Sequence, residues 1–284
     1  MAIRLNRNGA IAGAALGGVL FVAVLLVFAG RSGAQTQDGS VTVSVPPPVA
    51  DRIYASPMAQ GRPIVVLDAG HGGRDPGATS VSGEVHEKDL TLALARELRD
   101  QLVKRGRVRV AMSRDDDRYL DLEARAAVAR RLNAAMFVSL HMDSAPNPLA
   151  RGASVYSLSD VASDAEAARF ASIENGGVIA GEGNGSAAAM LSDLAMQGQM
   201  TESADLAARL IHKSAGRFEL RPEAHRFAAF HVLRRADTPA VLFEAGYISN
   251  ADDELLLRSP QHRAAVALGL ALAIEADVAV HSRR

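Results

Sequence analysis

The chain has 284 residues, enough for one large domain or two small ones, and a formal net charge of −1 at pH 7. A nearly neutral chain without a basic stripe or an aromatic platform excludes the usual nucleic-acid-binding functions. The absence of cysteine excludes disulfides, thiolate nucleophiles and cysteine-based zinc sites, so the folded part must depend on its apolar core.

Residues 1–34 have the pattern of an export signal. Two arginines precede an apolar run over residues 9–30, and small residues follow at 32–34. This order of charged start, apolar centre and small residues favours cleavage near Ala34. The run is also long enough to span a bilayer, so an uncleaved membrane anchor is the second interpretation. In both cases we expect the rest of the chain outside the cytoplasm, in the periplasm.

Residues 35–62 form a polar segment that contains three consecutive prolines at 46–48. That composition favours an extended linker over a packed element. The pattern of a folded domain begins at Pro63 and continues to about residue 279, with no internal repeat and no second core. We therefore predict a signal peptide or anchor, a linker, and a single domain over residues 63–279.

Strand and helix signals alternate through this domain. Short apolar runs predict strands, and apolar residues that recur on one face predict helices. The predicted strands are 64–67, 108–112, 136–140, 153–158 and 240–243, and the predicted helices are 87–104, 122–132, 203–215 and 264–276. Such alternation predicts an α/β fold, in which a mostly parallel, twisted sheet has helices on both faces.

One connection, from Asp164 to Thr201, is too long for this alternation. It begins with a helical pattern over 164–175, passes through a glycine-rich loop, and becomes helical again around Met190 to Met196. A simple insertion is one interpretation of this segment. A lid over a site is the other.

Three candidate metal ligands lie beside the predicted strands. His71 follows the first strand in a glycine-rich turn, and His141 follows the third predicted strand. Glu87 begins the next helix, where it is also a suitable first-turn residue, and His86 beside it is the competing candidate. Ligands gather at the carboxyl ends of strands in open α/β sheets, and two histidines with one glutamate are a known set for catalytic zinc. Taken alone, His71 is as well explained as a structural histidine.

A further carboxylate, Glu244, ends the apolar strand Val241-Leu242-Phe243-Glu244. A carboxylate there is costly to bury without a partner. Glu244 therefore either accepts hydrogen bonds from nearby loops or takes a proton from water that a metal has made more acidic.

Five segments occur in a characteristic order: Val66–Gly73, Glu87–Ala95, Ser113-Arg114 with Leu122–Arg125, Phe137–Asn147, and Val241–Asn250. Together they resemble the zinc-dependent N-acetylmuramoyl-L-alanine amidases, the group that includes bacterial cell-separation amidases. The resemblance covers about residues 63–277. It implies zinc ligands at His71, Glu87 and His141, and a catalytic glutamate at Glu244.

The resemblance implies direct hydrolysis of the amide that joins N-acetylmuramic acid to L-alanine in peptidoglycan. Zinc polarises the amide carbonyl, and Glu244 moves a proton from water to the departing nitrogen. Two alternatives are a zinc peptidase that cuts another peptidoglycan amide and a non-catalytic peptidoglycan-binding module. The complete residue set favours an enzyme, because a binding module has no use for a poised base.

Four more residues are expected to support the site. Asp68 and Asp143 are candidates to orient the two histidines, although both are also common turn residues. Arg114 and Arg125 are expected to fix loops by pairing with carboxylates. Neither arginine is expected to contact the substrate.

The resemblance also implies a role for the long insertion. In regulated members of the family, an insertion at this place forms a helix that plugs the active site, and its glutamate takes the position that the catalytic water needs. Glu174 is the matching residue, and Glu182 in the glycine-rich loop is the second choice. A solvated helix residue is the alternative interpretation of Glu174. In the plug interpretation Glu174 is a fourth zinc ligand, and a periplasmic activator of the LytM-like type binds the insertion and shifts the helix.

Overall fold

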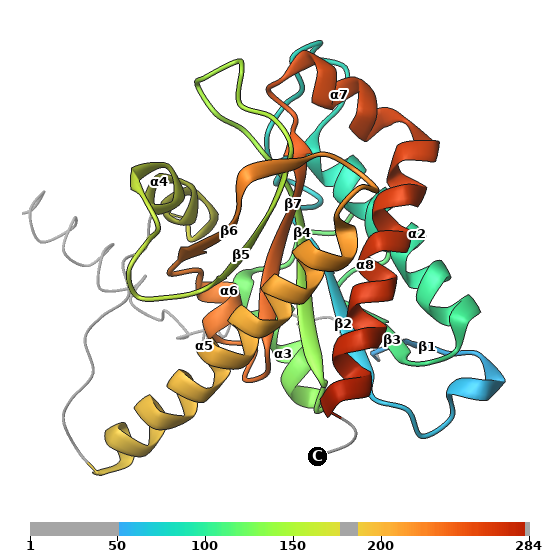
Figure 1. Ribbon diagram of the computed structural model, residues 1–284, viewed down its shortest axis with the longest axis vertical. Coiled ribbons are helices and arrows are strands. Elements are labelled where there is room, and N and C mark those ends of the chain that lie inside the picture. The colour runs from blue at the N-terminus through green and yellow to red at the C-terminus, as the bar shows by residue number, and fades with distance from the viewer. Residues whose placement is uncertain (1–50, 177–186, 282–284) are drawn as a thin grey trace, which may run out of the picture. The chain divides into compact units, whose positions relative to one another are not determined.

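The computed structural model describes residues 51–176 and 187–281. The predicted signal or anchor and most of the predicted linker therefore lie outside the described residues. Within those residues, seven strands form one sheet in the order β1-β3-β2-β4-β7-β5-β6 (Figure 1). Their bounds are β1 Ile53–Tyr54, β2 Ile64–Ala69, β3 Arg109–Met112, β4 Met136–Asp143, β5 Ala153–Leu158, β6 Leu220–Ala228 and β7 Ala240–Tyr247.

Most neighbouring strands of this sheet are parallel. The pairs β3–β2, β2–β4, β4–β7 and β5–β6 are parallel, whereas β1–β3 and β7–β5 are antiparallel. The α-helices between the strands are α2 Glu87–Arg105, α3 Leu122–Arg131, α4 Ala165–Glu174, α5 Ala187–Ser214 and α6 His231–Arg234, and α7 Ala251–Arg258 and α8 Pro260–His281 follow the last strand. The predicted α/β class and mostly parallel sheet are confirmed.

Helices cover both faces of the sheet, because successive residues of each strand point to opposite sides. Val65 and Leu67 of β2 face the core formed with α2, α5 and α8, which Figure 1 shows on the near side. Val66, between them, faces the second core, formed with α3, α4 and α6. By length and composition α8 could cross a membrane, but residues such as Leu270 and Ile274 are fully buried in the first core.

Three strands extend further than the sequence predicted. β2 continues to Ala69, and the extensions of β4 and β7 concern the candidate ligand and base. β4 continues to Asp143 and β7 continues to Tyr247, so His141 and Glu244 lie within strands instead of at their ends. The two residues are register partners across β4 and β7. The apolar pattern ended at these polar residues, but the backbone ladder between the strands continues past them.

The insertion begins as predicted and then differs. α4 starts after Asp164, whose side chain accepts a hydrogen bond from the backbone N–H of Ala167 at 2.9 Å. α5 begins at Ala187 and continues without a break through the helix predicted from residue 203. The edge strand β6, at the far side of the sheet from β1, was not predicted.

Candidate functional site

Three neighbouring parallel strands, β2, β4 and β7, bring the candidate residues to one edge of the sheet. The turn after β2 places His71 beside Glu87, the first residue of α2, with Nε2 of His71 3.1 Å from Oε2 of Glu87. The other ring nitrogen, Nδ1, lies 3.0 Å from Oδ2 of Asp75. Asp75 therefore fixes the orientation of the His71 ring while Nε2 faces the site.

His141 reaches the same carboxylate from β4. Its Nδ1 is 3.1 Å from Oε1 of Glu87, so each oxygen of Glu87 faces one histidine. Two glycines provide the necessary space. A Cβ on Gly70 would lie 2.5 Å from Cε1 of His141, and a Cβ on Gly77 would lie 2.7 Å from Oε2 of Glu87. A larger residue at either position would therefore displace a candidate ligand.

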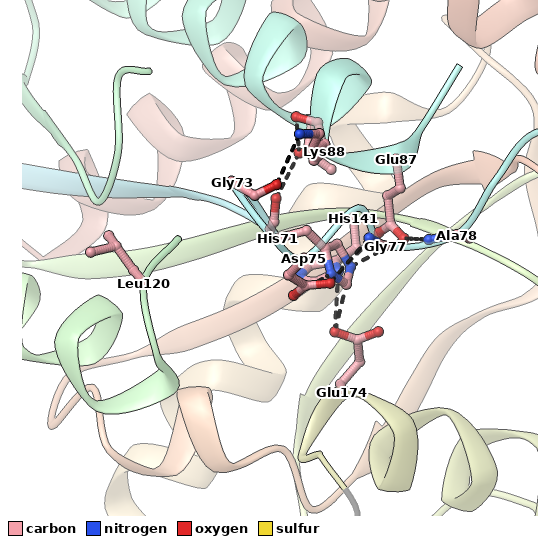
Figure 2. A network of polar contacts seen from close by, with 12 residues as sticks. His71, Gly73, Asp75, Gly77, Ala78, Glu87, Lys88, Leu120, His141 and Glu174 are labelled. Atoms are coloured by element: carbon pink, nitrogen blue, oxygen red, sulfur yellow. Dashed lines mark hydrogen bonds and ion pairs between the residues drawn. The ribbon is translucent and has the colours of Figure 1, made fainter. Parts of the chain in front are cut away.

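Glu174, the last residue of α4, points from the insertion towards both histidines (Figure 2). Its Oε2 lies 3.4 Å from Nδ1 of His141 and 3.9 Å from Nε2 of His71. The potential ligand atoms of His71, His141 and Glu174 all lie within 4.8 Å of one another. These three residues form a group that could hold a metal ion, and Glu87 faces the same two histidines.

The sequence offered two alternative candidates, His86 and Glu182. His86 does not face this group, since its Nδ1 lies 3.2 Å from Oγ1 of Thr79. Glu182, the second choice after Glu174, lies outside the described residues. Of the two neighbours at the start of α2, the structure thus brings Glu87 and not His86 to the histidines.

The histidines and carboxylates of this group shift one another's pKa values. Burial would lower the pKa of His71, but the carboxylates of Glu87 and Asp75 outweigh burial and raise it to about 11. Burial would raise the pKa of Glu87, but the two histidines outweigh burial and lower it. The pKa of Glu174 is raised because burial exceeds the opposing effect of the histidines. The site favours positive charge between its carboxylates, which is what a metal cation supplies.

The donor atoms fit zinc. Imidazole nitrogens and carboxylate oxygens are its usual ligands besides cysteine sulfur. Nε2 of His71 is buried and makes no hydrogen bond of good geometry within residues 51–176 and 187–281, which suits a metal ligand. Asp75 supplies the carboxylate that commonly holds the other nitrogen of a ligating histidine.

Glu244 lies beside His141 on the adjacent strand and is fully buried. Neither of its carboxyl oxygens has a hydrogen-bond partner in the described part of the chain. Burial, and then the negative charges of Asp143 and Glu87, raise the pKa of Glu244 well above its usual range. A buried carboxyl group of this kind next to a cation site is suited to proton transfer.

The two aspartates predicted to orient the histidines have other surroundings. Asp68 lies within β2 and accepts hydrogen bonds from Ser113 and Ser139, whereas His71 lies beyond the strand in a turn with a φ of 59°. Asp75, which the sequence analysis missed, occupies the place predicted for Asp68. The carboxyl oxygens of Asp143 are buried and have no hydrogen-bond partner among the described residues.

Both predicted loop-fixing arginines are buried and hold the backbone around the site. Nη1 of Arg125 lies 2.9 Å from Oδ1 of Asp68 and 2.7 Å from the carbonyl oxygen of Ala69. Arg114 donates to the carbonyl oxygens of Ala69 at 2.8 Å and Gly70 at 2.7 Å. Pairing with a carboxylate was therefore right for Arg125, whereas the hydrogen bonds of Arg114 go to backbone carbonyls and to the hydroxyl of Thr91.

A cavity of about 880 Å³ opens beside the metal group. The start of α3, the end of α4 and the segment around α6 form its walls. The residues that contribute include Tyr119, Leu122, Phe170, Ile173, Asn175, Phe230, His231 and Arg235. A cavity of this size can receive a sugar or a short peptide.

Residues 65–276, from β2 to α8, match the protein family described as N-acetylmuramoyl-L-alanine amidase. AmiC of Neisseria meningitidis is 35% identical over 220 residues, which are 75% of this chain and 52% of that protein. AmiA of Escherichia coli K12 is 32% identical over 227 residues, which are 77% of this chain and 78% of that protein. The chain thus spans about half the length of the Neisseria relative and over three quarters of AmiA.

The fold is also similar to a solved structure. The catalytic domain of CwlV, an amidase from Bacillus (Paenibacillus) polymyxa var. colistinus, superposes with a TM-score of 0.52 at 28% identity. The superposition covers 76% of this chain and 99% of that domain. The compared part of the chain therefore corresponds to a complete catalytic domain in that structure.

Proposed function

The chain belongs to the N-acetylmuramoyl-L-alanine amidase family, and from this premise we propose that it hydrolyses the amide between N-acetylmuramic acid and L-alanine in peptidoglycan. One observation carries the proposal. His71, Glu87 and His141 converge on one point, and Glu244, whose carboxyl group makes no hydrogen bond to the described residues, lies on the strand beside His141. A ligand set and a proton acceptor together are what metal-assisted hydrolysis requires.

In this proposal His71, Glu87 and His141 hold a zinc ion. Bound there, zinc would polarise the amide carbonyl and increase the acidity of water. Asp75 keeps the His71 ring oriented, so Nε2 stays directed at the metal position. Glu244 accepts the proton of the attacking water and delivers it to the departing nitrogen of L-alanine.

We further propose that α4 keeps the resting enzyme inactive. Glu174 would be the fourth zinc ligand, which leaves no position for water or substrate. Its distances to the two histidines support this role, as does the burial of Ala167, Phe170 and Ala171, which pack α4 against the sheet. Activation then requires a partner that binds the open state more tightly than the closed one. A periplasmic protein of the LytM-like type, acting in cell separation, is the proposed partner.

The N-terminal pattern supports the proposed location. Residues 1–34 have the features of an export signal or anchor, and a hydrolase of peptidoglycan must act outside the cytoplasm. We therefore place the enzyme in the periplasm. Detection of the full chain in periplasmic and membrane fractions would separate a cleaved signal from a retained anchor.

Mass spectrometry of purified wall fragments tests the proposed reaction. The fragments are incubated with the zinc-loaded full chain and, because the resting enzyme is proposed to be inactive, also with Glu174→Ala. We expect stem peptides that begin with a free L-alanine amino group, together with glycan strands that have lost their peptides. A new terminus at another amide would assign the enzyme to a different peptidoglycan bond. Intact fragments with zinc-loaded Glu174→Ala would contradict the catalytic assignment.

A further inference from the structure

A second buried polar cluster lies under the first turn of α4. Its centre is Arg226 of β6, whose residue surface is 2% exposed. Nη2 of Arg226 donates to both carboxyl oxygens of Asp164, the residue that caps α4, at 2.6 Å each. Nη1 lies 3.3 Å from Oε2 of Glu166 in the first turn of the helix. Both ion-pair partners of Arg226 within the described residues thus belong to the insertion.

The carboxyl groups of the sheet nearby have no such partners. Asp143 of β4 and Glu244 of β7 are both 0% exposed, and none of their four carboxyl oxygens has a hydrogen-bond partner in the described ranges. Nη1 of Arg226 also makes no hydrogen bond there. A cation and two carboxyl groups are therefore buried near one another without being joined. This is unusual, because buried polar groups are normally hydrogen-bonded.

Strand register places Arg226 and Glu244 on one face of the sheet. Arg226 is the register partner of Tyr156 on β5, and Tyr156 is the partner of Leu242 on β7. Glu244 lies two residues after Leu242 and points to the same side. The guanidinium of Arg226 already extends over β5, since its Cζ is 5.4 Å from the centroid of the Tyr156 ring. Neighbouring strands are about 4.8 Å apart. Glu244 therefore lies one strand beyond Tyr156 and two residues along β7 from its register partner.

We propose that Arg226 exchanges partners when α4 leaves the metal site. While α4 is docked, Asp164 and Glu166 hold Arg226. When α4 moves away with those carboxylates, the guanidinium pairs with Asp143 and Glu244, and it holds Glu244 in position for proton transfer. The inference rests on the proposed inhibitory role of α4. Arg226 is then a positioning residue, since it acts on the substrate only through Glu244.

The physical reason is the cost of an unpaired buried charge. Removal of one partner of a buried ion pair leaves a charge that water cannot reach, and the structure gains by providing another partner. Asp143 and Glu244 can provide one, since their carboxyl groups have no hydrogen-bond partner within residues 51–176 and 187–281. The two halves of the same ion pair therefore differ in function. Asp164 and Glu166 only restrain α4, whereas Arg226 first restrains α4 and later supports catalysis.

Variants of the two halves distinguish these roles in the full, zinc-loaded chain. The substrate is a soluble N-acetylmuramoyl-L-alanyl peptide. The double variant Asp164→Asn/Glu166→Gln frees α4 and keeps Arg226, so we expect resting hydrolysis to rise towards that of Glu174→Ala. Arg226→Gln also frees α4 but lacks the positioning group, so its hydrolysis should stay below that of the double variant.

The decisive comparison uses the Glu174→Ala background, in which the metal site is open. There we expect Arg226→Gln to lower kcat on the order of tenfold to a hundredfold through misplacement of Glu244, with little change in KM. Arg226→Lys should restore part of kcat, because it keeps a positive charge. The matched control is Arg234→Gln, which loses an ion pair with Asp160 outside the cluster and should leave kcat unchanged. Zinc content and the unfolding midpoint are measured for every variant.

The outcomes separate the inference from the function on which it rests. Equal activation by Arg226→Gln and by the double variant, with unchanged kcat in the Glu174→Ala background, would overturn the exchange. Arg226 would then only hold α4 in its docked position. If Glu174→Ala itself fails to raise hydrolysis, the inhibitory role of α4 is wrong, and the exchange is rejected with it.

Discussion

Asp68 and Glu244 are carboxyl groups buried on the same face of the sheet, on the two strands that flank β4, yet their surroundings are opposite. Asp68 accepts hydrogen bonds from two serines and Arg125. Burial would raise the pKa of Asp68, but Arg125 and the serines outweigh burial and lower it. Glu244 has no such partners within the described residues, and burial raises its pKa. Asp68, which is fully hydrogen-bonded, supports the site. Glu244, which makes no hydrogen bond to the described residues, is available to exchange a proton.

The largest expected effect is a loss of hydrolysis rate when Glu244 is replaced. Glu244→Gln keeps the size of the side chain but cannot accept a proton, so we expect kcat to fall by about 10²–10⁴-fold. The rate is measured with a soluble muramyl peptide in the Glu174→Ala background. The free energy of unfolding should not decrease, because no hydrogen bond to the described residues is lost. Turnover at the parent rate would show that another group transfers the proton.

Replacement of Asp68 is expected to lower the free energy of unfolding. Asp68→Asn leaves the buried guanidinium of Arg125 without its charged partner, and such a loss costs about 3–5 kcal/mol of the free energy of unfolding. Urea denaturation monitored by circular dichroism measures this loss. An unfolding free energy within about 0.5 kcal/mol of the parent would mean that the pair contributes little, as exposed pairs do.

In the metal-free protein the two groups should also give opposite pH dependences. The folded pKa of Glu244 is raised above its ordinary value of 4.5, so the folded protein keeps a proton that the unfolded chain loses as the pH rises. Above pH 4.5, the free energy of unfolding of the wild type should therefore fall by up to about 1.4 kcal/mol per pH unit relative to that of Glu244→Gln. The folded pKa of Asp68 is lowered from 3.8, so its contribution is present above that pH and is lost as the pH falls.

Urea titrations of the chelator-treated wild type and Glu244→Gln at pH 5, 6 and 7 check the first of these slopes. The same titrations of the wild type and Asp68→Asn between pH 5 and pH 3 check the second slope. The difference between their free energies of unfolding should shrink as the pH falls. A difference that is constant over pH in both comparisons would contradict the contrast between the two carboxyl groups.

The smallest expected effects come from two buried serines. Oγ of Ser139 donates to Oδ2 of Asp68 at 2.7 Å, whereas Ser154, the register partner of Glu244 on β5, has no hydrogen-bond partner for Oγ among the described residues. Ser139→Ala should cost about 1.5–3 kcal/mol, the value of a hydrogen bond to a charged group. Ser154→Ala should change the unfolding free energy by less than about 0.5 kcal/mol. Equal losses for the two variants would show that the bond to Asp68 has no special weight.

The fold followed from the sequence wherever apolar residues dominate an element. The strands β2 and β5 and the helices α2 and α3 lie close to their predicted bounds, because apolar runs and apolar helix faces mark them. β6 was missed, since Leu220–Ala228 contains Pro222 and alternates few apolar residues, as an edge strand tolerates. Its contribution is large, because it brings Arg226 to the buried cluster.

The site was less completely predictable than the fold. The spacing of His71, Glu87 and His141 relative to strand ends indicated that they come together, and the structure places them in contact. Asp75 was missed because its role depends on a tight turn that folds back on His71, and local turns of this kind leave no periodic signal. The choice between Asp68 and Asp75 as the partner of His71 depends on where β2 ends. A sequence pattern does not locate such a boundary to the exact residue.

The proposed metal site is tested by the zinc content of the purified chain, determined together with turnover. We expect one zinc per chain in the wild type and in Glu244→Gln, with turnover lost only in the latter when both carry Glu174→Ala. The double variant His71→Ala/His141→Ala, at matched purity and with a retained fold by circular dichroism, should bind no zinc and hydrolyse no muramyl peptide. Full zinc occupancy in this double variant would contradict the assignment of the metal site, and turnover without zinc would contradict the proposed chemistry.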